Sequence, residues 1–160
     1  MLESVALGST RPRGLARAQA RGIAEADSVL DLDGWDSAAK AALLANVWFE
    51  GNLRIVDVAR VGIEDLKDNH IRETAKDGTQ FRQVVSISRG PDDRPVARVE
   101  VEPISLADPL HTPMGSLGAL HVVLERGLAF TWHQGTSGLD DAALGLLGDL
   151  EAAKDFHERR

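Results

Sequence analysis

The sequence predicts an α+β fold in which helices cover one face of a mixed or antiparallel sheet. Three observations predict it. Helical patterns occupy the first half of the chain, alternating strand patterns follow from residue 80, and an amphipathic helical pattern closes the chain over residues 139–156. With 160 residues, 43% of them hydrophobic, the chain can bury a core and fits a single domain over residues 1–160.

The first half of the chain carries recognisable helix starts and stops. Pro12 and Gly22 bracket a short helix, because proline suits the first helical turn and glycine ends a helix. An acidic loop is expected next, over residues 25–34. A second helix is expected from about residue 37 to residue 49, with Asp36 placed to cap or charge its first turn.

The second half is typical of a sheet. Residues 56–66 indicate a short strand or turn followed by a helical turn, and residues 69–78 a helix closed by glycine. Residues 80–90 and 94–106 alternate as strands do, with a turn between them. Residues 118–135 indicate two more strands that meet near a Glu-Arg-Gly turn.

Composition and charge exclude several classes of protein. Acidic residues outnumber basic ones 25 to 18, and a net charge of -7 argues against binding to nucleic acid. The absence of cysteine excludes disulfides, thiolate zinc sites and cysteine nucleophiles. The longest apolar run, residues 41–49, is too short to span a membrane, and the first twenty residues lack the apolar stretch of a signal peptide. A soluble cytoplasmic protein is expected.

An unusual concentration of charge lies in the stretch AEADSVLDLDGWDSAAK, residues 24–40. Five carboxylates precede a single lysine, and they are Glu25, Asp27, Asp31, Asp33 and Asp36. Asp36 stands four residues before Lys40, so the two share one helix face. One interpretation is an ordinary ion pair that lets Lys40 reach solvent from an apolar helix. The other is a buried lysine, held in a pocket by carboxylates, that moves a proton or grips a substrate.

The segment DLDGWD, residues 31–36, also raises the question of calcium. If Gly34 took the turn position of an EF-hand, the closing glutamate position would be Lys40, which a calcium loop cannot use. A looser oxygen site remains an alternative. Trp35 is expected to pack the loop onto the domain, with a pocket wall as the second possibility.

The stretch GIAEADSVLDLDGWDSAAK, residues 22–40, resembles the signature of homoserine dehydrogenases. Its matching residues, all at family spacing, are Glu25, Asp31, Gly34, Asp36 and Lys40. Three later segments are similar to the family more weakly: VARVGIEDL, ARVEVEPISLADPL and WHQGTSGLDDAALGLLGDL. The resemblance covers most of this chain but only the back part of a family member.

The resemblance implies a role for each matching side chain. Glu25 and Asp31 would hold the ammonium group of the substrate, a task that suits carboxylates. Asp36 would help to bind the substrate and would orient Lys40. Lys40 would face the hydroxyl or aldehyde oxygen and assist its proton transfer. The reaction implied interconverts L-homoserine and L-aspartate 4-semialdehyde in threonine and methionine biosynthesis.

The resemblance also implies a cofactor and partners. NAD(P) would be bound mainly by a Rossmann domain that this chain lacks, because G-x-G-x-x-G occurs nowhere in it. We therefore expect a fragment, or a chain that works with a nucleotide-binding domain on another chain, and one that is inactive by itself. A homodimer through the sheet is expected, since the strands leave edges that need cover.

Two further hypotheses stay open. The chain could be a non-catalytic amino-acid-binding or dimerisation module, which the absence of a Rossmann domain favours, whereas Lys40 favours the enzyme. It could also be an acidic calcium-binding domain. Asp27 and Asp33 are expected to shape the loop rather than to take part in chemistry.

Overall fold

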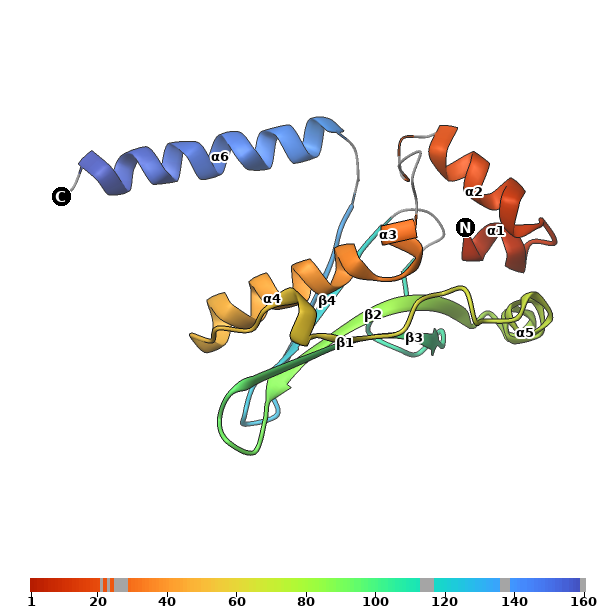
Figure 1. The fold of residues 1–160 in the computed structure, drawn as a ribbon, viewed down its shortest axis with the longest axis horizontal. Coiled ribbons are helices and arrows are strands. Elements are labelled where there is room, and N and C mark those ends of the chain that lie inside the picture. Colours follow the sequence, from red (N-terminus) through yellow and green to blue (C-terminus); the bar gives the residue numbers. More distant parts are fainter. Residues whose placement is uncertain (21, 23, 25–28, 113–116, 136–138, 159–160) are drawn as a thin grey trace. The chain divides into compact units, whose positions relative to one another are not determined.

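The computed structural model describes residues 1–20, 22, 24, 29–112, 117–135 and 139–158 (Figure 1). The chain forms two compact units, Met1–Asp108 and Pro109–Arg160, and each is described by itself. That residues 1–160 act as a single domain stays a prediction.

The first unit contains most of the helices and the larger sheet. Its elements, in chain order, are α1 (Leu2–Ala6), α2 (Arg11–Ala20), α3 (Val29–Leu32), α4 (Trp35–Phe49), η1 (Ile55–Asp57), β1 (Ala59–Arg60), α5 (Asp68–Thr74), η2 (Ala75–Asp77), β2 (Gln80–Arg89) and β3 (Pro95–Ile104). The second unit contains β4 (Ala119–Val123), β5 (Ala129–His133) and α6 (Leu139–Glu158).

The larger sheet has three strands in the order β1-β3-β2. Strands β2 and β3 form an antiparallel hairpin whose register runs from Gln80 opposite Ile104 to Arg89 opposite Pro95. The short strand β1 pairs with β3 in parallel, with Arg60 beside Val99. The sheet is therefore mixed, and the strands predicted over residues 80–90 and 94–106 are confirmed.

The helices of the first unit cover one face of this sheet. Alanines of α4 pack against Ala97 and Val99 of β3, and Val101 packs in the cluster of α1 and α5. Successive side chains of a strand alternate between faces, so residues 97, 99 and 101 share one face. Figure 1 shows α4 running along β2 and β3 on that side. The predicted α+β fold with one covered face is confirmed.

Helix α4 differs from its prediction in two respects. It begins at Trp35, because Gly34 takes the left-handed conformation (φ 82°) that precedes it. The second difference is its exposure, because the nearly continuous apolar sequence of residues 41–49 predicts a helix buried on most faces, and this prediction was wrong. Only its alanine stripe is buried, whereas Leu43 and Val47 are 65% and 66% exposed. Small alanines let a helix approach a sheet closely, and in the first unit the sheet covers only that stripe.

The structure tests two other local expectations and adds a helix that was not predicted. The segment 56–66 has a 3₁₀ turn (η1) before its short strand and, after it, a turn at residues 64–65 that belongs to no helix. The helix predicted over residues 69–78 is confirmed as α5 followed by η2, and Gly78 ends it with φ 83°. Helix α1, which the sequence analysis did not predict, packs Val5 against Ile71 and Phe81.

The second unit is a hairpin followed by a long helix. Strands β4 and β5 pair in antiparallel fashion, with Ala119 opposite His133 and Val123 opposite Ala129, which confirms the strands predicted over residues 118–135. Phe130 and Trp132 stack with ring centroids 5.8 Å apart. Helix α6 confirms the closing helix. Among the described residues, no helix is long and apolar enough to cross a membrane.

Candidate functional site

Asp36 and Lys40 form an ion pair on the outer side of α4. Lys40 Nζ lies 2.7 Å from Asp36 Oδ2, and the two side chains are 69% and 52% exposed. The sequence-based interpretation as an i,i+4 ion pair is confirmed, and the alternative of a buried lysine is wrong for this structure. The alanine stripe explains the difference, because it turns toward the sheet and leaves Asp36 and Lys40 on the opposite side.

This ion pair adds little to the stability of the fold. An exposed i,i+4 pair contributes about 0.3–0.5 kcal/mol, since water solvates both charges and two long side chains lose freedom. A charged ligand can therefore take over either partner at small cost. A zwitterionic amino acid offers groups that match both, an ammonium for the carboxylate of Asp36 and an oxygen acceptor for the ammonium of Lys40.

The turn that leads into α4, residues 32–35, is fitted closely to the end of β1; we call it the Gly34 turn. The backbone N–H of Ile63 donates a 2.9 Å hydrogen bond to the carbonyl oxygen of Leu32. A Cβ atom at Gly62 would lie 2.9 Å from that carbonyl oxygen and 3.1 Å from Asp33 Cα. Because glycine has no Cβ atom, position 62 allows the Gly34 turn to lie directly against the backbone of residues 62 and 63.

Two side chains of the sheet contact the first turn of α4. The guanidinium carbon of Arg60 lies 3.4 Å from the ring centroid of Trp35, a cation–π contact. The hydroxyl of Ser37 donates a 2.5 Å hydrogen bond to Gln83 Oε1. Trp35 thus packs the loop onto the domain, as expected from the sequence.

Sequence analysis missed Arg60 and Gln83. One signal could have revealed Gln83, because it interrupts the face of β2 that Phe81, Val85 and Ile87 otherwise make apolar. No local signal marks Arg60, whose contact with Trp35 arises only in the fold.

The remaining predicted site residues are placed only in part. Glu25 and Asp27 lie outside the described residues. Asp31 belongs to α3, but its side chain is outside what the structure describes. Asp33 Oδ1 would lie 3.4 Å from a Cβ at Gly62, which places this carboxylate against the end of β1 and agrees with a role in shaping the loop.

The described residues also show whether this chain could hold a metal ion or a dinucleotide. Within the part of the chain that the structure describes, no three His, Cys, Asp or Glu side chains gather as a metal ion requires. A dinucleotide site needs a glycine-rich turn between a parallel strand and a helix. The described strands pair in parallel only where β1 meets β3, over two residues of β1, and the sequence has no G-x-G-x-x-G. These residues do not fit NAD(P) as its main binding site.

Known proteins resemble the chain over most of its length. The sequence profile of the family described as homoserine dehydrogenase matches residues 2–150. The homoserine dehydrogenase of Sulfurisphaera tokodaii is 33% identical over 144 residues, which cover 89% of this chain and 42% of that protein. The NAD(+)-dependent homoserine dehydrogenase of Pseudomonas canavaninivorans is 29% identical over 136 residues, which cover 85% of this chain and 39% of that protein.

Solved structures agree. The crystal structure of Staphylococcus aureus homoserine dehydrogenase at pH 6.0 matches 98% of this chain and 40% of its own, with a TM-score of 0.82 and 22% identity. At that identity the similarity shows the shared fold alone. The chain spans less than half the length of each of these three relatives.

Proposed function

The chain belongs to the homoserine dehydrogenase family, and we propose that it forms the substrate-binding and catalytic part of such an oxidoreductase. The reaction proposed is the interconversion of L-homoserine and L-aspartate 4-semialdehyde with NAD(P), within threonine and methionine biosynthesis in the cytoplasm. The observation that carries the proposal is the Asp36–Lys40 pair, exposed at the start of α4 and 2.7 Å apart.

In this proposal the acidic residues recognise the amino acid. Glu25 and Asp31 accept hydrogen bonds from its ammonium group, which offers three N–H donors on a cation. Asp36 contributes a further carboxylate and keeps Lys40 oriented between turnovers. Asp36 lies in the first turn of α4, where the helix dipole favours a negative charge.

Lys40 serves the oxygen that changes between hydroxyl and aldehyde. In the reduction its ammonium donates a hydrogen bond to the aldehyde oxygen and supplies the proton that makes the hydroxyl, and in the oxidation its neutral amine accepts that proton from the hydroxyl. The charge of Lys40 also stabilises negative charge that develops on the oxygen. Because Lys40 is exposed in this chain, the substrate reaches it without any rearrangement of the alanine stripe.

NAD(P) is proposed to bind mainly to a nucleotide-binding domain outside this chain. Two observations support this: the described residues do not fit a dinucleotide site, and the relatives are more than twice as long as the segment they share with this chain. We therefore expect the chain alone to be inactive.

A homodimer is also part of the proposal. A two-stranded hairpin is marginally stable by itself. Strands β4 and β5 also carry exposed large apolar side chains, among them Phe130 and Trp132. Covering this hairpin with a second copy would bury that surface. Light scattering at micromolar concentration is expected to give twice the 17.2 kDa chain mass, and a monomer would contradict the dimer.

The test of function is a calorimetric titration of the chain with L-homoserine. We expect wild type to bind L-homoserine and Lys40→Ala to bind it more weakly, because the contact to the hydroxyl is lost. Lys76→Ala is the matched control, because Lys76 also forms an exposed ion pair, with Glu73 at 3.1 Å, away from α4. If wild type does not bind, the titration is repeated with NAD(P) and the nucleotide-binding domain of a relative supplied.

The same experiment separates the enzyme from the alternative, a non-catalytic amino-acid-binding or dimerisation module. The alternative is favoured by the lack of a dinucleotide site in the described residues. With the nucleotide-binding domain supplied, the enzyme oxidises L-homoserine and forms NAD(P)H, and Lys40→Ala abolishes this. Binding without any turnover in the supplemented sample would favour the module.

A further inference from the structure

We propose that Arg60 and Gln83 are positioning residues, which hold the Gly34 turn and the first turn of α4 so that Asp36 and Lys40 stay in place. The inference rests on the proposed function for its meaning in catalysis. Its geometry rests only on contacts between the sheet and α4, and these can be tested without any substrate.

Arg60 anchors the helix start to the sheet. It lies in β1, beside Val99, which is fully buried in β3, so the backbone of Arg60 is fixed by the sheet. Its guanidinium carbon is 3.4 Å from the ring centroid of Trp35, the residue directly before Asp36. A planar guanidinium stacked on an indole resists both sliding and tilting of the ring, which an aliphatic contact would not.

Gln83 holds the other side of the same turn. It pairs with Val101 in the β2–β3 register, and its Oε1 accepts the hydrogen bond from the hydroxyl of Ser37. Its Nε2 would lie 3.1 Å from a Cβ at Gly34, so the amide also lies against the turn. Gln83 therefore touches the residues on both sides of Trp35 and Asp36.

The choice of polar residues at these two positions is not explained by stability. Arg60 Nε and Gln83 Nε2 are buried, and no described protein atom accepts a hydrogen bond from either. A buried donor without an acceptor destabilises the folded state, so these two nitrogen atoms cost stability rather than add to it. We infer that the two polar side chains serve to fix the geometry at the start of α4.

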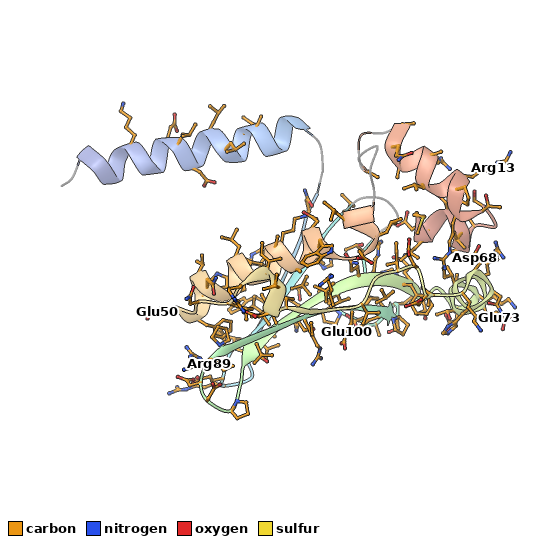
Figure 2. The ribbon with its side chains drawn as sticks, in the orientation of Figure 1. Arg13, Glu50, Asp68, Glu73, Arg89 and Glu100 are labelled. Atoms are coloured by element: carbon orange, nitrogen blue, oxygen red, sulfur yellow. The ribbon has the colours of Figure 1, made fainter. Side chains whose placement is uncertain are left out.

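The chain supplies its own control at the opposite end of α4. The guanidinium carbon of Arg89 lies 5.2 Å from the ring centroid of Phe49, the last residue of the helix. Figure 2 shows Arg89 near the end of α4 that Glu50 marks. Arg89→Gln removes a cation–π contact to the same helix but leaves the Gly34 turn untouched.

The experiment compares Arg60→Gln, Gln83→Leu and Arg89→Gln in the full chain. Two quantities are measured: the backbone ¹⁵N relaxation of residues 34–40, and the dissociation constant for L-homoserine. We expect Arg60→Gln and Gln83→Leu to add motion at residues 34–40 and to raise the dissociation constant about three- to tenfold, since only the ordered turn binds. Arg89→Gln changes neither quantity. Arg60→Lys restores part of the affinity at most, because an ammonium cannot stack as a plane.

Gln83→Leu distinguishes a role of Gln83 in positioning the start of α4 from a role in stabilising the fold. It removes a buried unpartnered donor, so we expect a melting temperature equal to or above that of wild type together with weaker substrate binding. The inference is overturned if residues 34–40 stay as ordered as in wild type in both variants, or if their affinity changes track their melting temperatures. Failure of wild type to bind L-homoserine would count against the proposed function, while the relaxation data would still decide the inference.

Discussion

Replacing Gly62 by alanine tests the close fit between the Gly34 turn and the end of β1. The new Cβ would lie 2.9 Å from the carbonyl oxygen of Leu32, 0.5 Å inside the 3.4 Å at which ordinary contact begins, and 3.1 Å from Asp33 Cα. Both neighbours are backbone atoms, so the turn itself must move. The movement also stretches the 2.9 Å hydrogen bond from Ile63 N–H to Leu32.

The expected size follows from two opposing terms. Forcing an extra methyl group into a packed site costs about 1–3 kcal/mol, whereas the restricted unfolded chain returns about 0.4–1 kcal/mol. The net loss is about 1–2 kcal/mol, or a fall in melting temperature of roughly 3–6 °C for a chain of this size. Homoserine binding should weaken as well, because Asp36 and Lys40 follow the turn.

Thermal unfolding monitored by circular dichroism measures the stability term, and calorimetric titration measures the binding term. Gly145→Ala is the control, since a Cβ at Gly145 in α6 meets nothing within 4 Å. Alanine in that helix should stabilise by up to about 1 kcal/mol. A Gly62→Ala variant that melts at or above the wild-type temperature and binds L-homoserine equally well would refute the reasoning.

Three further predictions concern the surroundings of α4. Asn46→Ala should cost about 1–3 kcal/mol in urea unfolding, because the side-chain amide donates to the carbonyl oxygen of Leu53 (3.0 Å) and accepts from its N–H (2.6 Å); an unchanged midpoint would contradict this. The hydrogen bonds from Arg54 hold the pKa of the Asp57 carboxyl below its ordinary value, so their stabilisation is present above the unfolded-state pKa and is lost as pH falls through the folded-state pKa. Titration by NMR should show that pKa rising in Arg54→Ala, and an unmoved pKa would speak against the pair. Leu43→Ser should change the free energy of unfolding by less than about 0.5 kcal/mol, because Leu43 is 65% exposed; a loss of several times that size would mean that α4 is covered on this side.

The sheet could be predicted from the sequence because the alternation of apolar and polar residues that indicates a strand lies within a short segment. Alternating residues run through β2 and β3, and a short turn separates the two strands. Helix α1 could not be predicted in this way. It is only five residues long, too short to be stable by itself, and it depends on Val5 packing against Ile71 and Phe81.

The site was predicted in part, and the error has a clear cause. The pairing of Asp36 with Lys40 follows from helix geometry alone, and it is confirmed. The alternative of a buried Lys40 rested on the apolar neighbours all round α4, but a helix without a polar face gives no sign of which side meets the sheet. Packing selected the small alanines, and Leu43 was left outside.

The supporting contacts of the site lie beyond the reach of local patterns. Ser37 and Gln83 are 46 residues apart in the sequence, and the contact between Arg60 and Trp35 also joins separate elements. Such contacts exist only once the registers of β1 and β2 against β3 are set. Sequence reasoning therefore identified the residues that carry charge and missed those that hold them in place.

The central claim is that the start of α4 binds the amino acid and that Lys40 faces its hydroxyl group. The most direct test maps amide shifts in the ¹⁵N-labelled chain during titration with L-homoserine and, in parallel, with L-2-aminobutyrate, which lacks the hydroxyl. The account predicts that both ligands shift residues 34–40 most, that the shift at Lys40 needs the hydroxyl, and that Lys40→Ala removes this difference. Shifts centred elsewhere, or identical responses to the two ligands at Lys40, would contradict it.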